Sequence, residues 1–410
     1  MSCTISDLAK ILRIDILGRP ESQPFNLENT QENWASSPQN SRGAQGLCRR
    51  RNELSSGQRM PINVVNIPYG NKNPYQNLLY SACKPEFCLI ASRSAPLSAF
   101  AKADFQPDQS IIHIHWDDRL FPKPETEAQD SDFRSTCDGM RQYQANGGRV
   151  IWTIHNQFAH SEGGKTDYFR NNRRELAEIV DLIHVHTPHA RQHMIDEYGT
   201  DPDKLRLIPH PSYLGVYEPS EQTLKRPLPL RERTHFLSFG TMRGSRELER
   251  LEDAAKKMTN RGHDFQVSVV GRVYPSGRRL MRRMRSNRNT TVIPDRIPDS
   301  EIAQVFSNVH AYMLPSTTTF TSGTAMLAQT FGLPIIGPDI DAHKHTTPEA
   351  CHDLLYPAQN PRGLIRMMMR VLSMSDEELA EKRQACLDFA VERRPHRISG
   401  DLKRALSELA

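Results

Sequence analysis

The stretch LPSTTTFTSGTAMLAQTFGLPIIGPD, residues 314–339, decides the fold of this chain. It predicts a strand end, a polar turn rich in threonine, and an apolar helix that begins at Ser322-Gly323. The break Gly332-Leu333-Pro334 then leads into a second buried strand. A helix that starts just after a strand turns unpaired backbone N–H groups and a positive dipole end toward the edge of a parallel sheet. Such an edge binds anions, most often nucleotide phosphates.

Length, charge and cysteine content limit the class of protein. At 410 residues the chain exceeds one ordinary core, so we expect two domains. The net charge of +5 is too small for a nucleic-acid binder and suits a protein that meets phosphates or an anionic membrane face. The seven cysteines form no CxxC pair, which predicts reduced thiols. We find neither a signal peptide nor a run of about 18 apolar residues, and so expect a cytoplasmic protein, at most peripheral to the inner face of the cell membrane.

Short apolar runs alternate with helical segments along most of the chain, which predicts βαβ units and parallel sheets. In the first half the predicted strands are 62–67, 87–91, 110–116, 149–155, 181–186 and 205–209. In the second half they are 234–240, 265–271, 291–293, 311–314, 335–337 and 354–356. A long helical tail over 361–392 and a last helix near 398–409 follow.

This pattern predicts an α/β protein with two Rossmann-like domains. We expect a poorly ordered N-terminal extension over residues 1–59, because few apolar residues there can be buried. A first Rossmann-like domain over 60–213, a proline-rich linker over 214–233 and a second Rossmann-like domain over 234–385 follow, with C-terminal helices over 386–410. In such pairs the ligand lies against the carboxyl ends of both sheets.

Glycines and arginines follow two strands of the second half. Gly240 ends the first of these strands and precedes Arg243 and Arg246, and Gly271-Arg272 ends the next in the same style. Guanidinium groups at neighbouring strand ends, beside the helix start at Ser322-Gly323, are suited to hold a diphosphate without a metal. The alternative is that the glycines only make tight turns and the arginines are solvated. Because three such ends converge on one sheet edge, we favour the nucleotide site.

Histidines gather at the strand ends of the first half, at positions 113, 115, 155, 184, 186 and 210. A lone strand histidine is usually structural, but several at one edge favour a polar pocket. His155 and Asp117 follow their strands directly and are the candidate general bases. We assign His115, Asn156 and His160 to the same pocket. The HxH pairs also suit a metal-dependent hydrolase, which stays a second hypothesis.

A basic segment, RRLMRRMRSNR over 278–288, carries six arginines in eleven residues. We favour a solvated helix face for it. Attraction to anionic lipid headgroups is the alternative.

These residues resemble the GT-B glycosyltransferases of the broad group 1 type. The resemblance rests on NPYQNLLY (73–80), IIHIHW (111–116), WTIHN (152–156), LIPHPSY (207–213), FGTMR (239–243) and, above all, TSGTAMLAQTFGLPIIGP (321–338). It is nearest to bacterial exopolysaccharide glycosyltransferases, including the xanthan β-mannosyltransferase branch. It implies a GT-B fold whose C-terminal helix crosses back to the N-terminal domain. The N-terminal domain, over 60–213, would then hold the acceptor, with His115, Asn156 and His160 as the candidate contacts, and the C-terminal domain, over 234–385, would hold a nucleotide-sugar.

The resemblance also implies roles for individual residues. Arg243 and Arg246 would neutralise the diphosphate of a nucleotide-sugar, Ser322 and Gly323 would offer backbone donors to it, and His155 would lie near the donor sugar. Retaining members carry two glutamates where this chain has Thr319 and Leu327, so we expect inversion. Glu349 is the candidate ribose contact.

We therefore expect a hexosyltransferase that uses a nucleoside diphosphate sugar (GDP-mannose or a UDP-sugar), a glycan or lipid-linked acceptor, and no metal or other cofactor. A role in exopolysaccharide synthesis fits this resemblance. A non-catalytic sugar-nucleotide or glycan binder is the third hypothesis, since the paired glutamates are missing.

Overall fold

The computed structural model describes residues 60–70, 73–92, 106–117, 127–157, 167–242 and 246–410, with only the backbone for 127–132, 246 and 247. The predicted extension over 1–59 lies outside these residues. Residues Ile62–Ala410 form one compact unit that holds every element given below. In this described part of the chain, no helix combines the length and the apolar character needed to span a bilayer.

Six parallel strands form the N-terminal sheet. They are β1 (Ile62–Ile67), β2 (Phe87–Ala91), β3 (Ser110–Ile114), β4 (Arg149–Thr153), β5 (Leu182–Val185) and β6 (Leu205–Leu207), in the order β2-β1-β3-β4-β5-β6. The winding changes direction between β1 and β3, which are neighbours. Ligands bind outside the carboxyl ends of strands at such a switch point.

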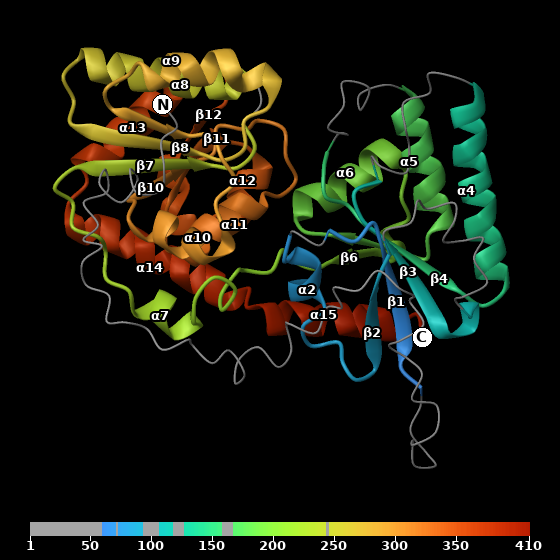
Figure 1. Ribbon diagram of the computed structural model, residues 1–410. Coiled ribbons are helices and arrows are strands. Elements are labelled where there is room, and N and C mark those ends of the chain that lie inside the picture. The colour runs from blue at the N-terminus through green and yellow to red at the C-terminus, as the bar shows by residue number, and fades with distance from the viewer. Residues whose placement is uncertain (1–59, 71–72, 93–105, 118–126, 158–166, 243–245) are drawn as a thin grey trace. The chain divides into compact units, whose positions relative to one another are not determined.

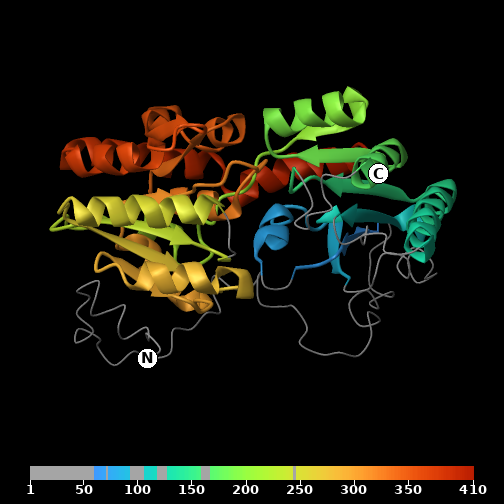
Figure 2. The same ribbon diagram turned by 90° about the horizontal axis from the view of Figure 1, so that it is seen from above.

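Helices cover both faces of this sheet, because successive side chains of a strand point to opposite faces. One face packs Val65, Ile112 and Trp152 against α4 (Glu127–Ala145), α5 (Asp167–Ile179) and α6 (Pro188–Tyr198). The other packs Val64 and Ile111 against α2 (Tyr75–Leu79) and α15 (Pro395–Ser407). Figure 1 labels these helices, and Figure 2 shows the same layers from above.

The C-terminal sheet is also parallel. Its strands are β7 (Thr234–Phe239), β8 (Phe265–Val270), β9 (Thr290–Ile293), β10 (Ala311–Met313), β11 (Ile335–Asp339) and β12 (Leu355–Pro357), in the order β12-β11-β10-β7-β8-β9. Here the winding changes direction between β7 and β10. The second switch point therefore lies at the ends of these two strands.

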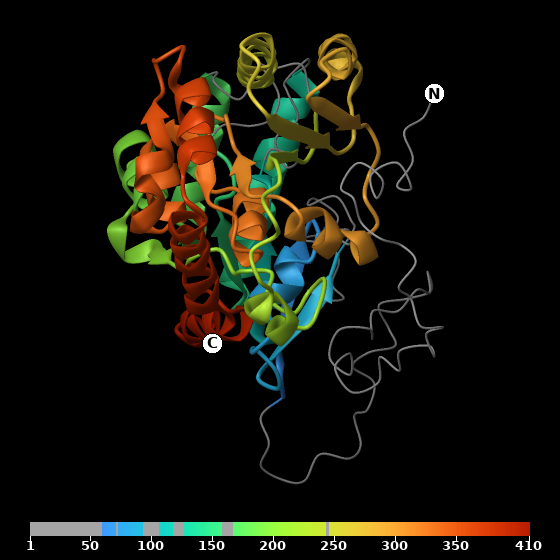
Figure 3. The ribbon, with the colours of Figure 1, turned by 90° about the vertical axis from the view of Figure 1, so that its left-hand side faces the viewer.

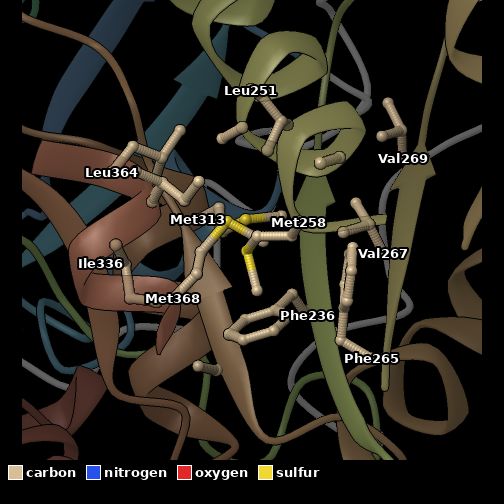
Figure 4. Close-up of a cluster of buried hydrophobic side chains, with 14 of the residues drawn as sticks. Phe236, Leu251, Met258, Phe265, Val267, Val269, Met313, Ile336, Leu364 and Met368 are labelled. Carbon is tan, nitrogen blue, oxygen red and sulfur yellow. The ribbon is translucent and has the colours of Figure 1, made fainter. Parts of the chain in front are cut away.

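The core of the C-terminal half lies between this sheet and three helices, α8 (Arg246–Asn260), α9 (Arg278–Arg285) and α13 (Gly363–Ser373). Figure 4 shows Phe236 and Met313 of the sheet against Met258 of α8 and Met368 of α13. The other face meets α10 (Asp299–Ser307), whose Phe306 stacks on Tyr312 of β10. Truncating a fully buried phenylalanine such as Phe236 costs about 3–5 kcal/mol.

The predicted C-terminal tail needs a correction. The sequence predicted one helical stretch over 361–392, but α13 ends at Ser373 and a separate helix, α14 (Asp376–Glu392), follows. Ser375 caps α14, because its side chain accepts a hydrogen bond from the Glu378 N–H. The last helix, α15, begins at Pro395 and returns to the N-terminal sheet, where Ser399 Oγ accepts from the Ala82 N–H at 2.8 Å. This return of the C-terminal helix confirms the prediction.

The segment predicted as a linker, 214–233, contains a short helix, α7 (Ser220–Lys225). Two further elements without a predicted counterpart are α12 (Asp341–Thr346) and the 3₁₀ helix η8 (Glu349–Leu354). The domain bounds proposed from the sequence stay predictions.

Candidate active site

Two glycine turns end the central strands of the C-terminal sheet. Gly240 follows β7 with φ +135° and Gly271 follows β8 with φ +139°, a conformation that side chains disfavour. A Cβ at Gly271 would lie 1.9 Å from the Gly240 carbonyl oxygen, so the two turns touch through their backbones. The predicted convergence of these glycines is therefore present. Together they leave the sheet edge open to the close approach of a ligand.

Helix α11 (Gly323–Thr330) begins beside these turns. A Cβ at Gly240 would meet Thr324 Cγ2 at 3.7 Å, which places the first turn of the helix at the same edge. Ser322 caps the helix by accepting from the Ala325 N–H at 3.2 Å. The Gly323 and Thr324 N–H groups have no hydrogen-bond partner among the residues that the structure describes. They are free donors at a positive helix end, as phosphate binding requires.

The N-terminal half reaches the same helix end. A Cβ at Gly323 would lie 3.0 Å from Tyr213 Oη, which would have to shift slightly, and in ordinary contact with His210 Nε2 at 3.6 Å. Tyr213 is held by a hydrogen bond from its backbone N–H to Thr330 Oγ1, at 3.0 Å. The LIPHPSY segment thus lies against the N-terminal end of α11.

Six buried histidines lie at the carboxyl edge of the N-terminal sheet, at positions 113, 115, 155, 184, 186 and 210. Burial lowers the pKa of all six, and the neighbouring imidazoles lower several further. For His184 and His210 the pKa falls to about 4. All six rings are therefore neutral near pH 7. Tyr75 lies at their centre, with ring centroids 5.1 Å from His155 and 4.9 Å from His210.

The tautomer of His155 follows from a chain of hydrogen bonds that begins at a backbone N–H. The Gly70 N–H donates to Gln76 Oε1 at 2.7 Å, so the other end of that amide, Nε2, donates to Asn66 Oδ1 at 3.1 Å. Asn66 Oδ1 is an acceptor, and His115 Nε2 therefore donates to it, at 2.8 Å. Because the neutral His115 ring carries one proton, its Nδ1 must accept.

His115 Nδ1 accepts from His155 Nε2 at 3.0 Å. His155 therefore carries its proton on Nε2, and its Nδ1 keeps a lone pair. That nitrogen has no hydrogen-bond partner in the described residues, and 8% of the His155 surface is exposed. Trp116, at the unusual φ of +47°, stacks on the ring at a centroid distance of 4.7 Å and fixes its plane. The arrangement gives one oriented acceptor for a proton.

A second chain runs beside the first. His184 Nε2 donates to the Ile208 carbonyl at 2.8 Å, so its Nδ1 accepts from Thr153 Oγ1 at 3.0 Å. Thr153 in turn accepts from His113 Nε2 at 2.6 Å, and the Tyr80 hydroxyl donates to His113 Nδ1. Both ring nitrogens of His113 and of His184 take part in these hydrogen bonds. These histidines are thus committed to structure.

Asp117, the other candidate base, is paired with Arg173. The two arginine nitrogens Nε and Nη2 contact its carboxylate at 2.7 and 3.2 Å, and both side chains are at most 3% exposed. Burial alone would lower the pKa of Arg173, but the charges and hydrogen bonds of Asp117 and Tyr198 together outweigh it and raise that pKa. Arg173 also donates to the carbonyls of Asn156 and Gln157, at 3.2 and 2.8 Å. The ion pair therefore holds the segment that follows His155.

The other predicted residues lie as follows. Arg272 is exposed, and its guanidinium lies 5.4 Å from the centre of the Tyr274 ring. Glu349 is exposed at the start of η8. Arg246 begins α8, but its side chain, like Arg243 and His160 as a whole, lies outside the described residues. The roles given to these residues stay predictions.

Comparisons with known proteins agree with this architecture. Residues 233–374 match the family model described as glycosyl transferases group 1, a range that includes both glycine turns and α11. Sucrose-phosphate synthase from Thermosynechococcus elongatus has a similar fold, with a TM-score of 0.62, 16% identity, and coverage of 86% of this chain and 100% of that one. The chain has the GT-B fold.

Two further GT-B structures are similar. Anabaena HepE in complex with UDP matches with a TM-score of 0.61 and 11% identity, over 85% of this chain and 100% of that one. The pneumococcal O-GlcNAc transferase GtfA, in complex with UDP and GlcNAc, matches with a TM-score of 0.55 and 14% identity, over 76% of this chain. The chain spans 59% of the length of GtfA. No protein of curated function matches the sequence.

The candidate site includes residues that the sequence analysis did not assign to a transferase. Tyr75, Tyr213 and Thr324 lie in it, and so does His210, which the sequence analysis placed among the strand-end histidines without giving it a role in the transferase. The segments 73–80 and 207–213, on which the resemblance rests, contain Tyr75, His210 and Tyr213 and could have pointed to them. For the hydrolase hypothesis, no group of three or more His, Cys, Asp or Glu side chains in the described part of the chain is placed to hold a metal ion.

Proposed function

We propose that this chain is a glycosyltransferase that moves a hexosyl group from a nucleoside diphosphate sugar to a hydroxyl of a glycan or lipid-linked acceptor. One observation carries the proposal. The free N–H groups at the start of α11 lie against His210, and Tyr75 packs against both His210 and His155, which keeps a lone pair. An anion site and an oriented proton acceptor are the two parts that such a transfer needs.

The donor diphosphate would bind at the edge made by Gly240, Gly271 and the start of α11. The Gly323 and Thr324 N–H groups donate to its oxygens, with Ser322 holding the helix end in shape. Arg243, Arg246 and Arg272 are the proposed cations of this site. When the bond between sugar C1 and the phosphate oxygen breaks, the electron pair passes to the diphosphate, and these donors stabilise its charge without a metal. UDP in the HepE and GtfA structures supports a UDP-sugar, with GDP-mannose as the other donor.

His155 would act as the general base. Its Nδ1 takes the proton of the acceptor hydroxyl while the oxygen of that hydroxyl attacks C1, which gives inversion at C1. Thr319 and Leu327 offer no carboxylate for the retaining route. Asp117 is already bound on both oxygens by Arg173, so we assign it to holding the Asn156 segment in place. His115, Asn156 and His160 remain the proposed acceptor contacts, and Glu349 the proposed ribose contact.

The test uses the full chain with radiolabelled UDP-glucose, UDP-glucuronate and GDP-mannose, a lipid extract as the acceptor source, and samples with and without EDTA. We expect transfer from one donor, resistance to EDTA, loss of transfer in His155→Ala, and inverted anomeric configuration by NMR. Binding of a nucleoside diphosphate without transfer from any donor would instead indicate a non-catalytic binder. Stoichiometric zinc or iron together with EDTA-sensitive hydrolysis would favour the hydrolase. A role in exopolysaccharide synthesis is part of this proposal, and a lipid-linked oligosaccharide as the labelled product supports it.

A further inference from the structure

A groove lies between α8 and α9, away from the proposed donor site. Its volume is about 540 Å³ and its walls include Glu252, Lys256, Thr259, Arg283, Asn287 and Arg288. Figure 1 and Figure 3 both show the two helices side by side on the same face of the C-terminal sheet. We call this feature the α8–α9 groove.

The groove lies at the amino edge of the sheet. Thr290, the first residue of β9, lines it, as do residues from the second half of α8. Gly240 and Gly271, by contrast, follow the carboxyl ends of β7 and β8. A ligand in the groove would thus occupy the opposite edge of the sheet from the donor diphosphate.

The groove carries positive charge that has few acidic partners. Lys256, Arg283 and Arg288 are all exposed. Arg283 contacts Glu252 at 3.6 Å, and no acidic side chain in the described residues pairs with Lys256 or Arg288. Polar groups complete the wall, and Asn287 Oδ1 accepts from Thr259 Oγ1 at 2.9 Å. The groove thus has two cations without acidic partners among the described residues, together with neutral side chains that can form hydrogen bonds. These groups suit the binding of an oxyanion.

Helix α9 extends this charge over the surface beside the groove. Its apolar residues Leu280, Met281 and Met284 are buried in the core. The arginines at 278, 279, 282, 283 and 285 are exposed, and at about 100° per residue they occupy the arc opposite the buried side chains. Since the apolar face of α9 is already used by the core, this helix can meet an anionic surface only through its guanidinium groups.

From these observations we propose that the α8–α9 groove binds a phosphate group, and that the arginine face of α9 binds the anionic surface around it. The headgroup of an anionic phospholipid in a bilayer and a soluble phosphate compound share this chemistry. The proposal is independent of sugar transfer, because the groove lies at the other edge of the sheet.

The test compares two triple variants of the full chain. The groove variant is Lys256→Gln, Arg283→Gln, Arg288→Gln, and its matched control is Lys225→Gln, Arg366→Gln, Arg404→Gln, which loses the same charge from exposed residues elsewhere. Co-sedimentation with vesicles of equimolar phosphatidylcholine and phosphatidylglycerol measures the bilayer arm, with pure phosphatidylcholine as the neutral reference. Calorimetric titration with inorganic pyrophosphate measures the soluble arm.

At about 1 kcal/mol per cation, the groove variant should bind the anionic vesicles roughly 100-fold more weakly than the native chain, and the control variant less than about threefold more weakly. Loss of a pyrophosphate site only in the groove variant would identify a soluble ligand instead. Equal losses in both triple variants, or no binding of either probe to the native chain, would overturn the proposal.

Thermal unfolding checks that both variants fold. If the groove variant does not fold, Arg283→Lys, Arg288→Lys keeps the charge and should keep binding to within about threefold. Loss of vesicle binding in that folded variant would also count against a site that recognises phosphate by charge. Nucleoside diphosphate binding should be unchanged throughout, so failure of this proposal is distinct from failure of the proposed transfer.

Discussion

His115 and His155 share a hydrogen bond of 3.0 Å that can run in only one direction while both rings are neutral. Asn66 Oδ1 accepts a hydrogen bond from Nε2 of His115, so Nδ1 of His115 can only accept from His155. The consequence is that Asn66, which does not contact His155 directly through a hydrogen bond, decides through His115 which nitrogen of His155 holds the lone pair. Metal-site and triad histidines are oriented in the same way by their outer partners.

The first prediction concerns His155 itself. Removing a general base costs about 10²–10⁴-fold in rate, so His155→Ala should lose transfer by this factor. Binding of the nucleoside diphosphate, measured by calorimetry, should be unchanged, because the anion site lies on α11. Burial lowers the pKa of His155, so native activity should persist as the pH falls below 6.5. An acidic limb that rises through pH 7 or above would contradict this assignment.

A second prediction tests the tautomer. In Asn66→Ala the Nε2–H group of His115 loses its acceptor. A buried donor that is left without an acceptor costs about 1–3 kcal/mol of stability. The His115 ring can relieve this cost by carrying its proton on Nδ1, so that it donates to Nε2 of His155. The neutral His155 ring then carries its own proton on Nδ1 and loses the lone pair that acts as the base. We expect kcat to fall about 100-fold with little change in the donor KM.

Asn63→Ala is the matched control, since Asn63 lies on the same strand and its buried Oδ1 has no partner in the described residues. It should keep kcat within about twofold. Equal losses of kcat in the two variants would show that Asn66 acts only through the stability of β1.

The third prediction separates two roles for Asp117. If it holds the Asn156 segment through Arg173, Asp117→Asn leaves a buried guanidinium without its counter-charge and destabilises the fold by about 3–5 kcal/mol. The double variant Asp117→Asn, Arg173→Met should recover much of this loss, as measured by urea unfolding. A single variant with native stability but no transfer would instead restore Asp117 as the base.

Much of the fold was predictable because local patterns and tertiary packing agree. β1 and β2 begin and end where the sequence predicted, since short apolar runs mark the limits of both strands. The helix start at Ser322-Gly323 was also predicted. The break at Ser375 was missed although Ser375 and Glu378 have the spacing of a capping box.

The candidate site was predictable only to the level of residue types at strand ends. The sequence placed His155 and Asp117 at one edge, but the direction of a hydrogen bond depends on which side chains face each other across β1, β3 and β4. Arg173 gave no signal, because an arginine on an amphipathic helix is normally solvated, whereas this one is 2% exposed. Its partner, Asp117, lies 56 positions away in the chain.

The fourth prediction concerns the glycine turns. Gly271→Ala would place a methyl group 1.9 Å from the Gly240 carbonyl oxygen, so either β8 or the Gly240 turn must move. We expect the loss of nucleoside diphosphate binding and a much lower thermal midpoint. Gly262→Ala is the matched control, because Gly262 has φ +77° but nothing within 4 Å of its Cβ position. It should cost only about 1–2 kcal/mol of backbone strain and keep binding.

The last prediction follows from the neutral histidines. His184 and His210 take up protons in the folded state only near pH 4, whereas unfolded histidine does so near 6.5. Between these values the unfolded state binds more protons, so the free energy of unfolding falls as the pH falls. The loss is about 1.4 kcal/mol per pH unit for each histidine, and it is absent above pH 6.5.

Urea unfolding at pH 7, 6 and 5 measures this slope, and His184→Gln should reduce it by about one proton. His345→Gln, at an exposed position, is the control and should leave the slope unchanged. His184→Gln can keep the hydrogen bond to the Ile208 carbonyl through its amide, so its stability at pH 7 should stay near native while its stability at pH 5 rises above it. A free energy of unfolding that does not change between pH 7 and 5 would mean that the folded and unfolded states take up the same number of protons, which would contradict the lowered pKa values of the buried rings.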